Sequence, residues 1–470
     1  MLYVRRQMSA QGIPLRFIAI VGSGPAGFFA AEALLKDPTV EVHLFERLTA
    51  PFGLVRYGVA PDHQKIKAVS KGFERTASDS RLRFFGNVTI GKDIQVHELA
   101  ELYDQVLYAH GCEASRELGV EGESLAGVHS ALSFVSWYNG HPDYVALPVN
   151  LDVTDVVIVG AGDVSLDVCR LLCSTHEELA ATDMPGFVLD EFKKKRVARI
   201  HILIRRGPAE ASFALKELRA LLDRPGIQVR CDLEVLRQAL GEELSEGPNG
   251  QRAKLEHLYD CCQQEVANVS TELRFHFLKS PVEFVAEPES HNANAATPSP
   301  RVARVRVEDN RLVESQGRIN AIGTGTFSET DAQLCLLAVG YRGVQLPGLP
   351  LDSKSGLILN VEGRVLAAAG QVLPRHYVVG WIKRGPQGVI GTNKGDSRAT
   401  VELMLQDLHS LPARPEPMTE QLLRSRHVSF ISYSDWERLD KVEMERGKQL
   451  GKPREKVLSA AAALEVLALS

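Results

Sequence analysis

The sequence contains few cysteines: there are seven in 470 residues, and no two are spaced as C-x-x-C. Zinc centres, iron–sulfur clusters and redox-active dithiols generally use closely spaced cysteine pairs. The pattern therefore argues against a protein-bound disulfide relay, and it predicts no metal site. We expect the thiols to act mainly as small buried hydrophobic groups in a reducing compartment.

Long apolar runs are also missing. A membrane-spanning helix needs about 18 or more consecutive apolar residues, whereas the best candidate, residues 457–469, is short and is interrupted by Glu465. We therefore expect no membrane span. With 54 basic and 59 acidic residues, the net charge is −5, which argues against a nucleic-acid-binding protein or a polybasic membrane anchor.

Acidic side chains are absent from the first 31 residues, which nevertheless contain Arg5, Arg6 and Arg16. This bias is typical of a mitochondrial presequence. A buried strand is expected to begin near Leu15, so little chain is left for targeting, and an ordinary N-terminal tail would have the same composition.

A chain of 470 residues exceeds the ~250 to 300 residues that one hydrophobic core serves, so two domains are expected.

A dinucleotide-binding turn is predicted near the N-terminus. An apolar strand, residues 17–21, precedes a helix expected over about residues 26–36. The junction carries the glycines of a Rossmann turn, Gly22, Gly24 and Gly27. They allow the tight turn, the close approach of backbone to a pyrophosphate, and the packing of helix on strand.

The charge after the second strand predicts which dinucleotide this turn binds. The strand of residues 40–45 ends at Glu46, where a carboxylate can accept hydrogen bonds from both ribose hydroxyls of an adenosine. The same charge repels a 2′-phosphate. The first site is therefore expected to hold FAD or NAD rather than NADP.

A second Rossmann turn follows the strand of residues 156–159, with Gly160 and Gly162 in the turn and Ser165 in the third position. The next strand, residues 200–204, ends in Arg205 and Arg206, where an NAD site would place an acid. Two guanidinium groups suit a 2′-phosphate. The alternative is a solvated strand end. The arginine pair therefore favours NADP at the second site. Because the sequence offers no dithiol to carry electrons between the two sites, we expect hydride to pass directly from nicotinamide to flavin.

The fold class is therefore predicted to be α/β, with two Rossmann-like domains. An FAD domain of residues 1–114 and 341–470 would be interrupted by an NADP domain of residues 115–340, with nicotinamide and flavin meeting at their interface. Two polar stretches, residues 241–251 and 287–300, are expected to be surface insertions.

Several segments together resemble one family. They are VGSGPAGFFAAEALL, PFGLVRYGVAPDHQKIK, FFGNVTIG, SALSFVSWYNGHPD, RRGP with KELR, GWIKRGPQGVIGTN, SDWERLD and GKPREK. This combination resembles the adrenodoxin reductase family of NADPH:ferredoxin reductases, over nearly the whole chain. The resemblance implies a flavoenzyme that takes hydride from NADPH onto FAD and passes single electrons to a two-iron ferredoxin, for haem monooxygenases or iron–sulfur assembly. It also implies the mitochondrial matrix, with a bacterial cytoplasm as the alternative.

The resemblance carries over to particular residues. For FAD, it implies contacts from Ala26, Glu46, Leu54, Val88, Trp381, Gly388, Val389 and Ile390. For NADP, it implies contacts from Ala161, Gly162, Asp163, Val164, Arg205, Arg206, Glu217 and Gly388. The candidates for a basic surface that docks ferredoxin are Arg252 and Lys254.

This chain departs from the family at the second turn, where Asp163 replaces the usual Asn and Ser165 the usual Ala. A carboxylate near a pyrophosphate is unfavourable unless it points away. His63 and Asp167 are candidates for proton handling near the flavin, although a loop hydrogen bond and a helix charge are equally good readings.

Two rival functions are compatible with two nucleotide sites. One is an NADPH-oxidising subunit of a larger synthase, similar to the small subunit of glutamate synthase. Such subunits carry an N-terminal cysteine-rich segment, whereas the first cysteine here is Cys112. The other is a non-catalytic flavoprotein that senses the dinucleotide redox state.

Overall fold

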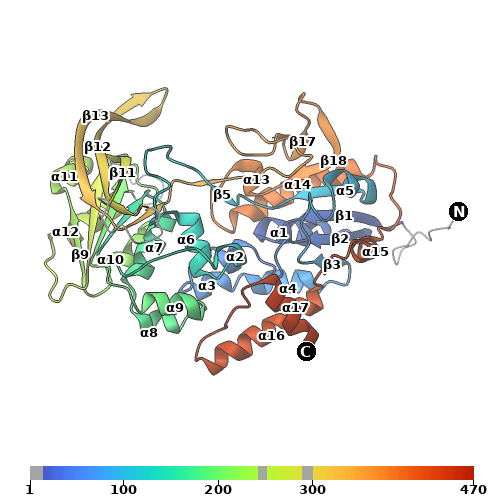
Figure 1. Ribbon diagram of the computed structural model, residues 1–470. Coiled ribbons are helices and arrows are strands. Elements are labelled where there is room, and N and C mark those ends of the chain that lie inside the picture. Colours follow the sequence, from blue (N-terminus) through green and yellow to red (C-terminus); the bar gives the residue numbers. More distant parts are fainter. Residues whose placement is uncertain (1–13, 242–250, 288–299, 470) are drawn as a thin grey trace. The chain divides into compact units, whose positions relative to one another are not determined.

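The computed structural model describes residues 14–241, 251–287 and 300–469, which form two compact units (Figure 1). The first unit contains residues up to 114, residues 139–145 and residues from 340 onward. The second contains residues 115–138 and 146–339. Both expected polar insertions fall largely on residues 242–250 and 288–299, outside the described residues.

The first unit is built on a seven-stranded sheet with the order β16-β17-β18-β4-β1-β2-β3. Strands β1 (Arg16–Val21), β2 (Val40–Phe45), β3 (Leu82–Phe85), β4 (Gln105–Tyr108) and β18 (Val372–Val378) are parallel. Strands β16 (Asn360–Val361) and β17 (Arg364–Leu366) extend it as an antiparallel edge. Strand β2 is buried along its whole length, and its two polar residues, Glu41 and His43, face each other with His43 Nε2 3.3 Å from Glu41 Oε1.

The helices of the first unit cover this sheet. They are α1 (Pro25–Leu34), α2 (Leu54–Tyr57), α3 (Gln64–Lys67), α4 (Ser70–Ala77), α5 (Val96–Leu102), α13 (Trp381–Arg384), α14 (Thr392–Leu408), α15 (Thr419–Ser425), α16 (Tyr433–Gln449) and α17 (Ala460–Leu469), with a 3₁₀ turn at Pro142–Tyr144. Helix α14, although distant in sequence, packs on α1. The C-terminal part of the chain thus completes the sheet and covers the first glycine turn.

The second unit contains a six-stranded parallel sheet with the order β6-β14-β7-β8-β10-β9. Its strands are β6 (Val128–Ser130), β7 (Asp155–Val159), β8 (Arg199–Ile204), β9 (Ile227–Cys231), β10 (Thr271–Phe277) and β14 (Leu334–Leu337). Strands β11 (Lys279–Ala286), β12 (Val302–Ser315) and β13 (Arg318–Asp331) form a separate antiparallel sheet. Two short strands, β5 (Ala114–Ser115) and β15 (Tyr341–Arg342), lie where the chain passes between the units.

The helices of the second unit are α6 (Ala131–Tyr138), α7 (Asp163–Cys173), α8 (His176–Ala180), α9 (Gly186–Phe192), α10 (Leu215–Leu222), α11 (Leu233–Gly241) and α12 (Gln251–Gln263). Helix α12 packs on both α10 and α11. Among the described residues of the whole chain, no helix combines the length and the apolar character that crossing a membrane requires.

One short segment differs from the expected division of the chain. Residues 139–145 were placed in the NADP domain, but they pack with the first unit. The carbonyl of Asn139 accepts a hydrogen bond from Lys456 Nζ at 2.8 Å, and Asp143 Oδ2 accepts one from Arg47 Nη1 at 2.7 Å. These partners are remote in sequence, so the local pattern gave no sign of the excursion.

The cysteines are less uniformly buried than expected. Cys112, Cys169, Cys262 and Cys335 are buried, but Cys173, Cys231 and Cys261 are only partly buried. All seven are free thiols. Four of the seven thus fit the expectation of mainly buried thiols, and the other three are less enclosed than expected.

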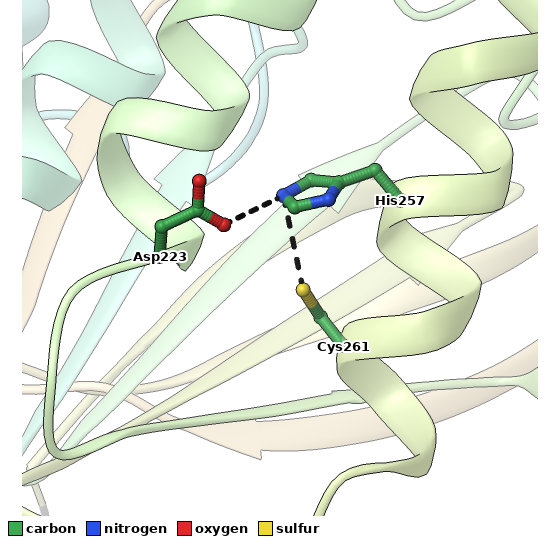
Figure 2. Close-up of side chains that lie close together, drawn as sticks. All are labelled: Asp223, His257 and Cys261. Atoms are coloured by element: carbon green, nitrogen blue, oxygen red, sulfur yellow. Dashed lines mark hydrogen bonds and ion pairs between the residues drawn. The ribbon is translucent and has the colours of Figure 1, made fainter.

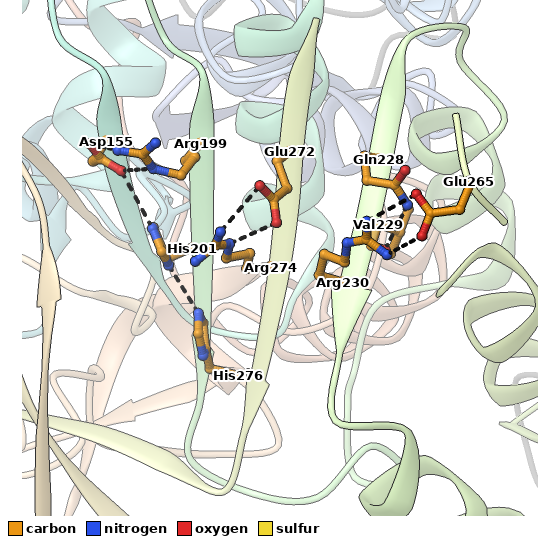
Figure 3. Close-up of polar contacts among 10 residues, drawn as sticks. All are labelled: Asp155, Arg199, His201, Gln228, Val229, Arg230, Glu265, Glu272, Arg274 and His276. Carbon is orange, nitrogen blue, oxygen red and sulfur yellow. Dashed lines mark hydrogen bonds and ion pairs between the residues drawn. The ribbon is translucent and has the colours of Figure 1, made fainter. Parts of the chain in front are cut away.

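A band of polar side chains crosses the parallel sheet of the second unit (Figure 3). Asp155 on β7 pairs with Arg199 on β8 through Oδ2 and Nη2 at 2.8 Å. His201 Nδ1 on β8 lies 3.0 Å from His276 Nε2 on β10. Burial, together with the neighbouring His201, lowers the pKa of His276 to about 4. Burial also lowers the pKa of His201, so both rings are neutral at pH 7.

This histidine pair predicts acid sensitivity. The unfolded chain protonates His276 at its ordinary pKa of 6.5, whereas the folded chain does so only near 4. The free energy of unfolding must therefore fall as the pH drops from about 6.5 towards 4. Replacing His276 with Asn should reduce the loss of stability between pH 7 and pH 5 by roughly 1 to 2 kcal/mol. Urea unfolding at the two pH values tests this, with the exposed His97→Asn as control; identical pH dependence in all three proteins would contradict it.

Candidate nucleotide sites

The first glycine turn lies between β1 and α1, and two of its three glycines meet a steric demand. Gly22 has φ +103°, and a Cβ atom there would lie 2.7 Å from the carbonyl oxygen of Ala109. A Cβ atom at Gly27 would lie 2.1 Å from the oxygen of Gly22. A Cβ atom at Gly24, by contrast, would meet nothing within 4 Å. The turn is thus closed against its own unit at two glycines and open at Gly24, as a pyrophosphate cradle requires.

Two remote segments of the first unit adjoin this turn. A Cβ atom at Gly53, just before α2, would lie 3.0 Å from Gly24 Cα, and one at Gly380 would lie 2.6 Å from the Cβ of Ala26. Helix α14 contributes Ser397, whose hydroxyl donates to the carbonyl of Ala26 at 3.0 Å. The structure therefore brings the segments that contain Leu54 and Trp381 close to the first turn.

Glu46 is fixed at the end of β2 with only 8% of its surface exposed. Its Oε2 accepts hydrogen bonds from the Ser23 backbone at 3.1 Å and hydroxyl at 2.7 Å, and its Oε1 accepts one from Leu48 N at 3.1 Å. The amide of Val88 donates to the Glu46 carbonyl at 2.9 Å, which places Val88 beside it. A carboxylate offers about four acceptor sites, so about one remains. This is fewer than acceptance from both ribose hydroxyls would need.

Trp381 and the segment 388–390 present groups that a planar polar ligand would satisfy. Trp381 begins α13 and stacks on Tyr341, with ring centroids 5.7 Å apart. Its buried Nε1 has no hydrogen-bond partner among the described residues. Val389 is 73% exposed, and Gly388 has φ +80°. An orphaned buried donor and an exposed apolar side chain, near an open glycine cradle, fit a flavin dinucleotide.

The second glycine turn repeats this geometry between β7 and α7. Gly160 has φ +137°, and a Cβ atom there would lie 2.4 Å from the oxygen of Ala338. A Cβ atom at Gly162, the N-cap of α7, would have no neighbour closer than 3.8 Å. Val164, in the first turn of α7, is half-buried. Ser165 is fully buried, and its hydroxyl has no partner among the residues that the structure describes.

The segment of residues 207–214, here called the arginine loop because it follows Arg206, is docked on this turn. The carbonyl of Ala161 accepts hydrogen bonds from Ser212 N at 2.9 Å and Ser212 Oγ at 2.8 Å. Asp163 Oδ1 accepts one from Ala214 N at 2.7 Å. The carboxylate that departs from the family pattern is therefore directed at the arginine loop.

Arg205 and Arg206 follow β8, and their backbone is held in place. The carbonyl of Arg205 accepts from Asn310 Nδ2 at 2.9 Å, and that of Arg206 accepts from Leu278 N at 3.1 Å. Within the described part of the chain, neither guanidinium makes a hydrogen bond or an ion pair with protein. Arg199 on the same strand, in contrast, is paired with Asp155. The pair thus offers donors that the protein itself does not use.

Lys254 does not belong to a docking surface, which corrects the expectation. It lies on α12 and is 3% exposed. Its Nζ donates to the carbonyls of Ala211 at 2.9 Å and Phe213 at 3.1 Å. Burial lowers its pKa. Lys254 therefore supports the arginine loop from its buried side. Arg252, in contrast, is exposed, and its Nε lies 2.8 Å from Glu256 Oε1.

The remaining candidates fall in different units. In the second unit, the buried Arg170 donates from Nη1 to Asp167 Oδ1 at 2.6 Å, and the same nitrogen lies 3.7 Å from Glu217 Oε2. This brings Asp167 and Glu217 together and gives Asp167 a structural ion pair. In the first unit, His63 precedes α3, and its carbonyl accepts from Ile66 N at 3.0 Å. Proton handling by His63 and Asp167, and contact of Gly388 with NADP, stay predictions.

Comparison with known proteins gives consistent relatives. Residues 17–255 match the family model described as pyridine nucleotide-disulphide oxidoreductase. The chain is 39% identical over 466 residues to the NADPH-ferredoxin reductase FprA of Mycobacterium tuberculosis, covering 96% of this chain and 98% of the relative. It is also 39% identical over 464 residues to the human mitochondrial NADPH:adrenodoxin oxidoreductase, covering 96% and 91%. The structure of the Mycobacterium tuberculosis FprA in complex with NADPH superposes with a TM-score of 0.89 at 38% identity, over 97% of this chain and all of the other.

The hydrogen bonds from Lys254 to the arginine loop predict that this lysine positions the loop for NADPH binding. Lys254→Met removes two charge-assisted hydrogen bonds, each worth roughly 1.5 to 3 kcal/mol, from the loop carbonyls. We expect the KM for NADPH to rise about tenfold while kcat changes little, because the loop loses order before binding. Steady-state kinetics with Lys193→Met as control, an exposed lysine of the same unit, tests this. A fall in kcat with an unchanged KM would contradict the positioning role.

Proposed function

The chain belongs to the family of NADPH–ferredoxin and NADPH:adrenodoxin reductases, and we propose that each of its two units supplies one nucleotide site for that reaction. The protein is an FAD-dependent oxidoreductase that takes hydride from NADPH and passes electrons to an iron–sulfur ferredoxin. The observation that carries the proposal is the contrast in charge between the two glycine turns. A buried carboxylate, Glu46, follows the second strand of one turn. Arg205 and Arg206, whose guanidinium groups pair with none of the described residues, follow that of the other.

FAD is assigned to the first unit. The open cradle at Gly24, the remaining acceptor capacity of Glu46 and the orphaned Nε1 of Trp381 support this assignment. The chemistry that FAD supplies there is the conversion of a two-electron hydride into single electrons. The residues of the unit would bind and orient it: Leu54 and Val88 by packing, and Gly388, Val389 and Ile390 through their backbone.

NADPH is assigned to the second unit. The backbone of Ala161 to Val164 would receive the pyrophosphate at the N-terminus of α7, an 11-residue helix. Arg205 and Arg206 would bind the 2′-phosphate by charge-assisted hydrogen bonds. Because Asp163 is already engaged with Ala214, its negative charge is held towards the loop.

The finer identity of the partner is also proposed: a two-iron ferredoxin with an acidic face, which approaches near Arg252. An exposed cation speeds association with such a partner and does so less at high salt. The compartment proposed is the mitochondrial matrix, supported by the basic, acid-free N-terminal sequence, with a bacterial cytoplasm as the alternative. The relatives include a human mitochondrial protein and a mycobacterial one.

The proposal is tested by NADPH-driven reduction of cytochrome c by the purified yellow protein, with and without a two-iron ferredoxin, at low and moderate salt. Strong stimulation by ferredoxin that declines with salt is the expected result. If NADPH bleaches the flavin but ferredoxin gives no stimulation, the acceptor is wrong, and a synthase-type subunit becomes the better reading. If NADPH does not bleach the flavin at all, a non-catalytic redox sensor becomes the better interpretation.

Arg205→Ala tests the assignment of NADP. Loss of one charge-assisted contact of roughly 1.5 to 3 kcal/mol should raise the KM for NADPH ~10- to 100-fold and leave kcat nearly unchanged. The KM for NADH should change little, so the preference of the enzyme for NADPH over NADH becomes smaller. Arg219→Ala, an exposed arginine on α10, is the matched control. A retained preference in Arg205→Ala would show that the 2′-phosphate is bound elsewhere.

Glu46→Ala tests the assignment of FAD. Removal of the carboxylate should weaken FAD retention by ~1 to 3 kcal/mol, because a ribose hydrogen bond is lost. The substitution also frees the Ser23 amide and hydroxyl. Ser23→Ala therefore serves as the control, since it removes the internal hydroxyl contact but keeps the carboxylate. Flavin absorbance per protein after dialysis is the readout, and equal occupancy in Glu46→Ala and wild type would refute the role.

A further inference from the structure

A cluster of three potential metal ligands lies in the second unit, on α10 and α12 (Figure 2). Asp223 is the C-cap of α10, while His257 and Cys261 lie one turn apart on α12. We name these three residues the α10–α12 cluster. None of them belongs to the glycine turn or the arginine pair, so the proposed nucleotide chemistry does not account for them.

The three side chains converge on a single point. Asp223 Oδ1 lies 3.1 Å from His257 Nε2, and Cys261 Sγ lies 3.8 Å from the same nitrogen. The three ligand atoms all lie within 4.8 Å of one another. Figure 2 shows both contacts meeting at one edge of the imidazole ring.

This arrangement differs from a catalytic relay. In a nucleophile–histidine–acid triad, the nucleophile and the acid contact opposite ring nitrogens, so that a proton passes across the imidazole. Here both contact Nε2, which carries at most one proton, so one hydrogen bond to Asp223 leaves the sulfur without it. A cation placed among the three atoms would be bound by all of them.

The two separations from His257 Nε2 are close to those of tetrahedral coordination. Bonds of ~2.0 to 2.2 Å to nitrogen and oxygen and of ~2.3 Å to sulfur, at tetrahedral angles, separate N from O by about 3.4 Å and N from S by about 3.6 Å. The observed separations of 3.1 and 3.8 Å differ from these by a few tenths of an ångström. Small side-chain rotations would suffice to close the site.

We propose that the α10–α12 cluster is a binding site for a zinc-like divalent cation, with water as the fourth ligand. Sulfur and imidazole ligands select zinc over Mg²⁺ or Ca²⁺, which prefer oxygen. The side chain of Asp223 is 59% exposed and that of His257 is 19% exposed, so an ion and a water molecule have access. On binding, the Cys261 thiol releases its proton to solvent, and the neutral His257 ring binds through Nε2 with its own proton on Nδ1. One proton thus leaves as one Zn²⁺ enters, and the net charge of the site rises by one.

An occupied site would join the C-terminus of α10 to α12, the helix whose Lys254 supports the arginine loop.

The test titrates metal-free, untagged, full-length holoenzyme with Zn²⁺ against a chromophoric zinc chelator. One equivalent should bind, raise the unfolding temperature, and show one sulfur neighbour near ~2.3 Å by X-ray absorption. Cys261→Ser and Asp223→Asn should each lower the affinity at least tenfold. Cys231→Ser, which changes another partly buried thiol of the same unit, should leave it unchanged.

The variants are checked by circular dichroism and by flavin bleaching with NADPH, so that a folding defect is recognised. Asp223 is the more exposed position, and Asp223→Asn keeps the test decisive if Cys261→Ser fails to fold. Any of three results would overturn the proposal: the wild type binds no stoichiometric zinc in the titration, Asp223→Asn binds it as tightly as wild type, or Cys231→Ser loses the binding. Each of these results leaves the nucleotide sites unaffected.

Discussion

The carbonyl oxygen of Ala161 accepts two hydrogen bonds from Ser212, and the proposed chemistry of the second unit depends on this contact. It fixes the arginine loop to the same glycine turn that would receive a pyrophosphate. Lys254 supports the loop from the buried side, and Asp163 holds its end. Because the loop is satisfied by these groups, the guanidinium of Arg205 need not be used internally and is left to a ligand.

The two units show how one backbone arrangement can discriminate between two nucleotides. Each has a strand, a tight turn whose first glycine is closed against the protein and whose second is open, and a helix. The difference lies in the group that follows the next strand. Glu46 places a buried negative charge there, and Arg205 and Arg206 place two positive ones. Under the proposed assignment, a 2′-phosphate would be repelled at the first and attracted at the second, so that the sign of the charge would sort the two nucleotides.

The sequence predicted the parts of the sites that are local in the chain. Strand, glycine spacing and helix lie within about 20 residues, so their pattern is sufficient to place the turns and the group after the second strand. Contacts between remote residues were not predictable. The sequence suggested that Lys254 is a surface cation, whereas the three-dimensional packing buries it against the arginine loop. Likewise, the spacing of His257 and Cys261 is visible on one helix, but Asp223 joins them only through the packing of α10 on α12.

The central claim is that the second unit recognises the 2′-phosphate through an unpaired, preorganised arginine pair. Its most direct test is calorimetric titration of the holoenzyme with 2′,5′-ADP and, separately, with 5′-ADP, which differ in the 2′-phosphate but need no catalysis. The account predicts that 2′,5′-ADP binds at least ~100-fold more tightly, since two charge-assisted contacts contribute roughly 3 kcal/mol or more. Equal affinities would contradict it, because the phosphate would then make no contact that favours binding.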